Sequence, residues 1–195
     1  MTNKFDNLLQ EVRACKVCEP FLPLGANPIV QAHPESKIVI VGQAPGLRVH
    51  QTGIPWDDAS GNELRKWLNV TTEEFYNPKF FALLPIGFCY PGKGKSGDLP
   101  PRKECAPLWH HRLLDEMKEV ELILLIGQYA QKYYLKDNNH KNITENIIHF
   151  KDYLPHYFPL PHPSPRNFIW MNKNPWFKEN ILPNLTTLVE NILSK

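Results

Sequence analysis

The stretch Lys37-Ile38-Val39-Ile40-Val41 runs directly into the turn Gly42-Gln43-Ala44-Pro45-Gly46. A short apolar run closed by glycine and proline is typical of a strand that is buried on both faces of a parallel sheet. Far downstream, the apolar residues 157–160 lead into His162-Pro163-Ser164-Pro165-Arg166-Asn167. Ligands of open α/β sheets bind just past the carboxyl ends of the strands. We therefore expect the two motifs to face each other across one cleft.

The rest of the chain alternates between strand-like and helix-like segments. Residues 80–84 and 122–126 are nearly all apolar and predict two further strands. Helices are expected at 5–14, 60–68, 104–118, 128–135 and 176–193, with a short turn or helix at 71–74. Loops are expected at 86–103 and 136–146, and the second is expected to lead into a short helix. This alternation predicts an α/β fold with three layers, α/β/α, around a central, largely parallel four-stranded sheet.

Length and charge limit the possible classes of protein. The chain has 195 residues, which suits a single domain over 1–195 with its own core. Lys and Arg number 22 and Asp and Glu 20, a net charge of +2, so any surface for nucleic acid has to be local. Nothing in the sequence resembles a membrane span or a secretory signal. We expect a monomeric cytoplasmic protein that does not act at a membrane.

The four cysteines, Cys15, Cys18, Cys89 and Cys105, form a close pair and a distant pair. Structural disulfides are not expected in a reducing compartment. Four thiolates are the ligand set of an iron–sulfur cluster and also of a structural zinc ion. The residue pattern alone leaves both possibilities open.

The order of these motifs resembles the uracil-DNA glycosylase superfamily, and most of all its iron–sulfur branch, families four and five. The matching segments are Cys15-Lys16-Val17-Cys18, Gly42 to Gly46, Gly53-Ile54-Pro55-Trp56, the pair Cys89 and Cys105, and His162-Pro163-Ser164. Each motif is weak by itself, but together they follow the family's order over about 12–193. The resemblance implies a glycosylase that hydrolyses the N-glycosidic bond of uracil or another deaminated base in DNA. No lysine matches the motifs, so a monofunctional enzyme without Schiff-base chemistry is expected.

Several positions depart from that branch. Gln43 stands where the branch usually has Glu, Val49-His50 where it has an acidic pair, and Trp56 where it has Phe. Pro85 stands where the family has an Asn that reads the Watson–Crick edge of uracil. These changes leave open which base is removed and which group activates water. They also sustain an alternative, a non-catalytic member of the fold that binds damaged DNA or a nucleotide.

The resemblance gives His162 and Gln43 the catalytic roles. His162 would donate a hydrogen bond to O2 of the base, where the negative charge of the leaving group gathers, and a neutral imidazole serves this purpose. Gln43 is not a base, so at most it positions water. Asp57 and Asp58 are the nearest carboxylates in sequence, and either takes the missing acidic role or both are solvated acids before a helix. The space between the turn and His162 is expected to hold one base.

The other site residues are expected to hold the extruded base and the DNA backbone. Trp56 would stack on the base, the alternative being a core tryptophan. Gly42 and Ala44 would line the base, Pro45, Gly46 and Ser60 would press on flanking phosphates, and Ser164, Pro165, Arg166 and Asn167 would form a loop that enters the minor groove. Ser60 is also expected to cap the helix at 60–68. Lys93, Lys95, Arg102 and Lys103 form a local basic patch in the sequence.

For the cysteines, the resemblance implies a [4Fe–4S] cluster on Cys15, Cys18, Cys89 and Cys105, with zinc or no metal as the alternatives. The role is structural in either metal-bound case. A bound group would pin the N-terminal segment to the proline-rich loop at 86–103.

Overall fold

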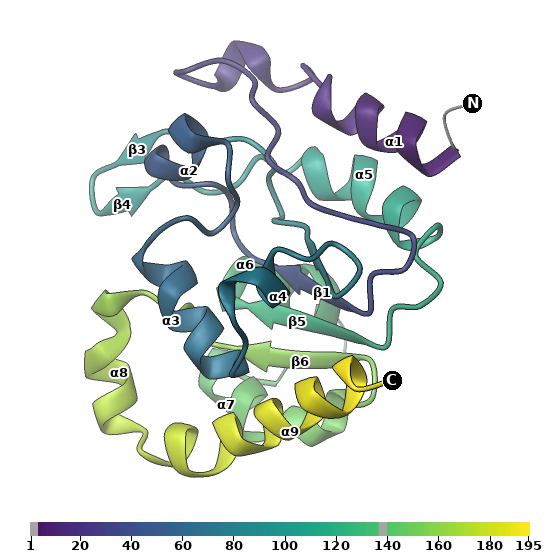
Figure 1. Cartoon of the computed structure of the whole chain (residues 1–195). Coiled ribbons are helices and arrows are strands. Elements are labelled where there is room, and N and C mark those ends of the chain that lie inside the picture. The colour runs from purple at the N-terminus through teal and green to yellow at the C-terminus, as the bar shows by residue number, and fades with distance from the viewer. Residues whose placement is uncertain (1–3, 137–139) are drawn as a thin grey trace.

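Four parallel strands in the order β2-β1-β5-β6 form the centre of the molecule (Figure 1). These strands are β1 (Ile38–Val41), β2 (Phe81–Leu83), β5 (Leu122–Ile126) and β6 (Tyr157–Leu160). This computed structural model describes residues 4–136 and 140–195. The predicted α/β fold with a central parallel sheet is confirmed.

The strand β1 lies inside the sheet because it is apolar on both faces. Ile38 pairs with Phe81 of β2 on one side and with Leu122 of β5 on the other. Every residue of β1 is buried. Parallel sheets need strands of this kind because helices cover both of their faces. Since all four strands run in the same direction, their carboxyl ends lie along one edge of the sheet, and the segments that follow them meet there.

The helices are α1 (Lys4–Arg13), α2 (Leu47–Thr52), α3 (Ala59–Leu68), α4 (Thr72–Phe75), α5 (Cys105–Leu114), α6 (Gly127–Leu135), α7 (Ile143–Ile148), α8 (Phe168–Lys173) and α9 (Leu182–Leu193). Shorter 3₁₀ or π segments are η1 (Glu19–Phe21), η3 (Phe150–Tyr153), η4 (Pro165–Asn167) and η5 (Phe177–Ile181). A small antiparallel hairpin consists of β3 (Lys93–Gly94) and β4 (Gly97–Asp98). Among the helices that the structure describes, none has the length and apolar character needed to cross a membrane.

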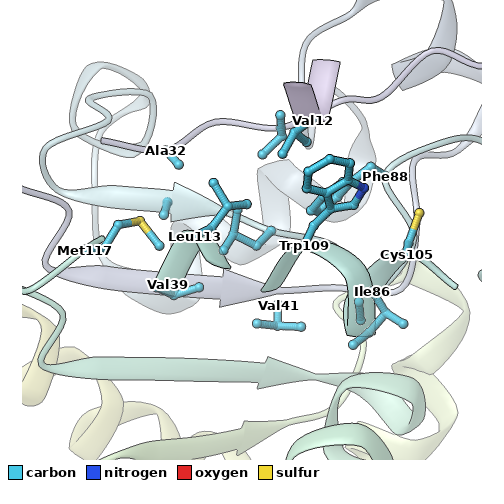
Figure 2. Packing of buried hydrophobic residues seen from close by; sticks show 14 of the residues in the cluster. Val12, Ala32, Val39, Val41, Ile86, Phe88, Cys105, Trp109, Leu113 and Met117 are labelled. Carbon is cyan, nitrogen blue, oxygen red and sulfur yellow. The ribbon is translucent and has the colours of Figure 1, made fainter. Parts of the chain in front are cut away.

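Helices cover both faces of the sheet and form two cores. Alternate residues of a strand point to opposite faces. Val39 and Val41 therefore pack with residues of α1, α5 and α6, whereas Ile38 and Ile40 pack with residues of α3, α4, α7 and α9. Figure 2 shows the first core, in which Trp109 of α5 lies between α1 and the sheet. The result is the predicted three-layer arrangement.

The helices α2 and α8 and the hairpin β3–β4 were not predicted from the sequence. The helix α2 begins directly after Gly46, the hairpin β3–β4 forms within the segment 86–103 that was expected to be a loop, and α8 follows the His162 motif. The helix predicted at 104–118 ends at Leu114. The loop predicted at 136–146 includes 137–139, which lie outside the described residues, and its last residues begin α7.

The predicted cap of α3 is wrong by two residues. Asp58 is the N-cap, and its Oδ1 accepts a hydrogen bond from the amide of Gly61 at 2.8 Å. Ser60 therefore lies inside the first turn of α3, where its side chain cannot cap the helix. The short turn or helix expected at 71–74 is present as α4, at which Thr71 and Glu74 form a reciprocal capping box.

Candidate active site

The turn after β1 and the histidine that follows β6 line the same small hollow, which we call the inner hollow. The structure thus brings together two motifs from opposite ends of the chain. The residues of the inner hollow are Ile29, Gly42, Gln43, Ala44, Pro45, Gly46, Val49, Pro55, Trp56, Asp58, Pro85 and His162. Its floor is the carboxyl edge of the sheet, where ligands of this class of fold bind.

Glycines allow Trp56 to lie directly over the turn. A β-carbon on Gly42 would be only 2.8 Å from Cζ2 of Trp56. A β-carbon on Gly61 of α3 would be 1.8 Å from the carbonyl oxygen of Trp56. Trp56 itself has a φ of 58°, in the left-handed region that bulky residues rarely adopt. Strained backbone conformations of this kind cluster at functional sites, so the conformation of Trp56 supports its place in the candidate site.

The inner hollow alone is smaller than a nucleobase. Its volume is about 50 Å³, whereas a cavity that holds benzene measures about 150 Å³. The indole of Trp56 takes part of the space, since its ring centre lies 6.0 Å from that of His162 with 30° between the ring planes. The sequence predicted a space for one base here, and the structure differs from that expectation because the indole lies over Gly42.

A larger open cleft adjoins the inner hollow and shares Gln43 and His162 with it. We call it the outer cleft, and its volume is about 900 Å³. Its residues are Gln43, Ile126, Gly127, Gln128, Tyr129, Asn142, Ile143, Thr144, Glu145, Pro161, His162, Asn167 and Trp170. The aromatic rings and amides in this set offer stacking surfaces and hydrogen bonds. A flat ligand that touches His162 can therefore extend from the inner hollow into the outer cleft.

His162 is held in place by Asn167. The amide Nδ2 of Asn167 donates a hydrogen bond to the backbone carbonyl of His162 at 2.6 Å. Burial lowers the pKa of His162 below its ordinary value, and the negative charge of Asp58 offsets part of this effect. The imidazole is therefore neutral at neutral pH. A neutral imidazole carries one N–H, which can donate a hydrogen bond to a ligand in the hollow.

The two carboxylates next to Trp56 have different partners. Asp58 lines the inner hollow, but its Oδ1 is used as the cap of α3. Asp57 does not line the inner hollow, and its Oδ2 lies 3.5 Å from Nη2 of Arg48. Gln43 lines both spaces, and its Nε2 donates to the carbonyl of Leu99 at 3.3 Å. This bond directs the Gln43 side chain toward the proline-rich loop.

Pro85 forms a wall of the inner hollow and is held from behind by His110. Nε2 of His110 lies 3.0 Å from the Pro85 carbonyl, and Nδ1 lies 2.7 Å from the hydroxyl of Tyr134. Burial lowers the pKa of His110 to about 4, so the ring is neutral. Since a carbonyl only accepts, the proton is on Nε2 and the Tyr134 hydroxyl donates to Nδ1. A proline carries no amide hydrogen, so this wall offers a ligand an apolar surface.

The loop after His162 lies beside the hairpin β3–β4. Ser164 accepts a hydrogen bond from the amide of Arg166 at 3.3 Å, which closes the turn η4. Pro165 and Arg166 are exposed. Nη1 of Arg166 lies 3.8 Å from the place that a β-carbon on Gly97 would occupy. The guanidinium is thus at the rim of the site and open to solvent.

The residues that were predicted to contact the DNA backbone differ in their exposure to solvent. Gly46 and Ser60 are half-buried, whereas Pro45 is buried in the wall of the inner hollow. Pro45 can therefore shape the turn, but it does not present a free surface to a phosphate. Ala44 lines the hollow beside it and is half-buried.

Arg102, one member of the predicted basic patch, already interacts with other side chains of the protein. Nη2 of Arg102 lies 2.6 Å from Oε1 of Glu104, and the guanidinium lies over the ring of Phe21 at 4.3 Å from its centre. Lys93, Lys95 and Lys103 are exposed. The free positive charge of this region is therefore carried by lysines of the hairpin and the loop.

The four cysteines line one small apolar pocket, together with Leu22, Ala26, Pro28, Phe88 and Trp109. All four are free of disulfides. Burial raises the pKa of Cys89 to about 11 and that of Cys105 to about 12. Four converging thiols without disulfides form the donor set of a thiolate-ligated metal group.

The spacing of these sulfur atoms bears on the kind of group. Four sulfurs on a single zinc ion, with Zn–S bonds of about 2.3 Å, would lie about 3.8 Å apart. No three cysteine sulfurs in the described residues have mutual separations within 4.8 Å. As they stand in the structure, the four thiols therefore do not form the closely spaced ligand shell of a single ion.

Sequence reasoning missed another group of metal-ligating side chains. His140, His149 and Asp152 have ligand atoms that all lie within 4.8 Å of one another, and no other such group is found in 4–136 and 140–195. The available signal was the pair His149 and Asp152, three residues apart in the sequence. That spacing is too common on protein surfaces to be diagnostic without the position of His140.

A comparison with known protein families matches the chain to one of them. The model of the Uracil DNA glycosylase superfamily matches residues 30–186. The matched range contains the whole central sheet and every residue of the inner hollow except Ile29. Cys15 and Cys18 lie before it.

Proposed function

The chain belongs to the uracil DNA glycosylase superfamily, and we propose that it is a monofunctional DNA glycosylase that removes uracil or another deaminated base from DNA. We place it in the iron–sulfur branch of that superfamily. We also take residues 1–195 as one glycosylase-like domain that acts as a monomer in the cytoplasm.

The observation that carries this proposal is the neutral His162 on the wall opposite the Gly42–Gly46 turn. Breaking the N-glycosidic bond leaves negative charge on the base and makes the sugar resemble an oxocarbenium ion. A preorganised N–H directed at a base carbonyl stabilises that charge as it develops. Asn167 fixes the backbone of the residue that carries this donor.

Water is the second reactant, and Gln43 is in a position to orient it. Gln43 lines both the inner hollow and the outer cleft. An amide does not remove a proton efficiently, so a strong general base is absent from this assignment. Bond breaking therefore has to be largely complete before water attacks. The leaving-group contact of His162 is accordingly expected to supply most of the catalysis.

The base would lie across the boundary between the inner hollow and the outer cleft. The inner hollow of about 50 Å³ does not hold a whole base, but His162 and Gln43 border both spaces. Trp56 offers a ring face for stacking, a contact worth about 1–3 kcal/mol. The base has to leave the DNA stack to reach this place.

Base selection follows from the wall at Pro85. The proline has no amide hydrogen, and the His110 N–H already takes one of the two acceptor positions of its carbonyl, so the backbone of Pro85 offers the edge of a base no hydrogen-bond donor. Selection then depends on His162 and the turn amides, which address a carbonyl next to the glycosidic nitrogen or a similarly placed acceptor. We therefore propose tolerance for more than one deaminated base.

The DNA backbone would be held at the rim. Arg166 and the lysines of the hairpin are exposed beside the site and supply positive charge. Ser164, Pro165 and Asn167 give the loop a fixed shape, which suits insertion into the minor groove. Ser60 and Gly46 are half-buried and would contact flanking phosphates.

Cys15, Cys18, Cys89 and Cys105 would hold a [4Fe–4S] cluster. The convergence of four free thiols in one pocket supports this. The pocket is separate from the residues of the inner hollow, so the role we assign is structural.

The test is base release from defined oligonucleotides. Purified protein is incubated with strands that carry uracil, hypoxanthine or xanthine, and abasic sites are then cleaved with alkali. We expect cleavage with at least one substrate and a loss of about 10²-fold or more in His162→Ala. If the wild-type protein binds these strands but releases none of the three bases, it is a non-catalytic binder. This is the second candidate function, and Gln43 and Pro85 are the residues that favour it.

A further inference from the structure

We propose that His140, His149 and Asp152 bind a divalent transition-metal ion of the zinc class on the surface of the protein. The site is distinct from the four cysteines, and none of its ligands lines the inner hollow or the outer cleft. It is the tightest set of ligand atoms in 4–136 and 140–195.

The distances are close to those of a coordination shell. Nε2 of His140 lies 3.1 Å from Oδ2 of Asp152. Two ligands on a tetrahedral zinc ion, with bonds of about 2.0–2.1 Å, lie about 3.3 Å apart. The rings of His140 and His149 have centres 4.5 Å apart and planes at 23°, and the third ligand atom is within 4.8 Å of the others. A small rotation of one side chain would complete the site.

Local structure brings two of the ligands to one side of the chain. The amide of Asp152 donates to the carbonyl of His149 at 3.0 Å, which forms a 3₁₀ turn at the end of α7. Residues three apart in such a turn lie nearly on top of one another. His149 and Asp152 therefore approach an ion together.

The third ligand is fixed by a buried amide. The backbone N–H of His140 donates to Oδ1 of Asn146 at 2.8 Å, and the same oxygen accepts from the hydroxyl of Tyr153 at 2.7 Å. Asn146 is 1% exposed. The backbone of His140 is thus anchored to the core, although its ring faces the surface cluster.

The donor set has the chemistry of a zinc-class site. Two imidazoles and one carboxylate suit Zn²⁺, Ni²⁺ and Co²⁺ better than Mg²⁺ or Ca²⁺, which prefer oxygen ligands. The side chains of His140, His149 and Asp152 are 34%, 47% and 60% exposed, so an ion and water can reach them. Glu145, with Oε2 at 3.8 Å from Nε2 of His149, is the nearest further carboxylate in the cluster.

An ion here would fasten one wall of the outer cleft. His140 precedes Asn142, Ile143 and Thr144, which line that cleft. The ion would join His140 to the turn at the carboxyl end of α7, whereas the cleft residues lie at or before the first turn of that helix. The role is therefore to hold the segment that leads into α7 against the body of the protein.

The same region is connected to the strand that carries His162. Nδ2 of Asn146 donates to Gln131 at 2.9 Å, and Nε2 of Gln131 donates to the carbonyl of Leu160 at 2.9 Å. This buried chain of hydrogen bonds ties α7 to α6 and to the end of β6. The metal site thus adds to a rigid support that already exists behind the cleft.

Cobalt titration of the protein as purified tests the proposal. Co²⁺ bound by nitrogen and oxygen gives visible d–d bands without the near-ultraviolet charge-transfer band of a cobalt thiolate, so the cysteine site is distinguished in the same spectrum. We expect the protein to bind one equivalent of Co²⁺ without a thiolate charge-transfer band, and we expect Zn²⁺ to displace this Co²⁺. We expect His149→Ala and Asp152→Asn each to weaken binding at least about tenfold.

Two further variants test the third ligand and provide a control outside the cluster. His140→Phe keeps an aromatic ring next to His149 but removes the ligand nitrogen, and it should also lose binding. His156→Ala removes an exposed histidine outside the cluster and should leave binding unchanged. Cobalt that binds only with thiolate charge transfer, or equally well to all variants, would overturn the proposal, as would a wild-type protein that binds no Co²⁺ or Zn²⁺ outside the cysteines.

Discussion

At the scale of single residues, the contact between Gly42 and Trp56 shapes the inner hollow. A β-carbon at position 42 would lie 2.8 Å from Cζ2 of Trp56. We expect Gly42→Ala to lower the free energy of unfolding by about 1–3 kcal/mol, because the indole has to move out of a packed position. Under the proposed function, base release should fall with it, because the displaced ring would enter the space assigned to the base. Urea unfolding and the oligonucleotide assay measure the two effects.

A double-mutant cycle isolates this contact. Trp56→Phe removes the benzo ring to which Cζ2 belongs, so Gly42→Ala should cost much less stability in the Trp56→Phe background than in the wild type. Equal costs in both backgrounds would show that the glycine is needed for another reason, such as its backbone conformation.

His110 makes stability depend on pH. Its pKa is about 4 in the folded protein, because the ring is buried, and about 6.5 in an unfolded chain. Below pH 6.5 the unfolded chain takes up a proton that the folded protein does not, so stability falls as the pH falls from about 6.5 to about 4. At about 1.4 kcal/mol per pKa unit, the loss reaches about 3 kcal/mol.

The measurement compares the wild type with His110→Gln in urea between pH 4 and pH 8. Glutamine can still donate to the carbonyl of Pro85, but it does not titrate. The variant should be less stable at pH 8 and should lose less stability than the wild type on acidification. Parallel pH profiles for the two proteins would contradict the assignment.

At the scale of elements, substitutions of Asp58 at the start of α3 distinguish a helix-capping role of this residue from a catalytic one. Asp58 caps the helix and also lines the inner hollow. Asp58→Ala should lower the free energy of unfolding by about 1 kcal/mol, whereas Asp58→Asn should keep the cap and nearly all the stability. Under our proposal Asp58→Asn also keeps base release. A loss of about 10²-fold or more in Asp58→Asn at full stability would make Asp58 the group that activates water.

The elements that the sequence predicts well are those with a strong local signal. The strand 122–126 has nearly all apolar residues, and the structure gives β5 as Leu122–Ile126. The hairpin β3–β4 could not be predicted, because its strands have two residues each and contain Gly94 and Gly97. The helix α2 was hidden for a similar reason, since Leu47–Thr52 is short and has only Val49 buried.

The candidate site was only partly predictable. The turn at Gly42 and the motif at His162 are visible in the sequence because each follows an apolar strand, and a parallel sheet then places them together. The volume of the hollow was not predictable, because it depends on the rotation of one indole ring. The metal-ligand cluster was not predictable either, since His140 reaches His149 through the buried contact of Asn146.

At the scale of the whole molecule, residues 16–28, which follow α1, have little apolar packing of their own, whereas α1 packs in the first core. The small core there consists of Cys18, Leu22 and Cys89, with Ala26 packed against it. This core is far smaller than the two that cover the sheet. A cross-linking group on the cysteines is therefore expected to supply much of the stability of residues 15–28.

We accordingly expect Cys89→Ser to abolish the visible absorbance of an iron–sulfur cluster and to make the segment around Cys18 the first site of limited proteolysis. The sheet and both large cores lie outside this segment, so far-ultraviolet circular dichroism should change little. Val17→Ala is the matched control, because Val17 lies between two of the cysteines and is 58% exposed. If Cys89→Ser keeps both the absorbance and the protease resistance of the wild type, the four thiols do not hold a shared group. Packing alone would then fasten the segment.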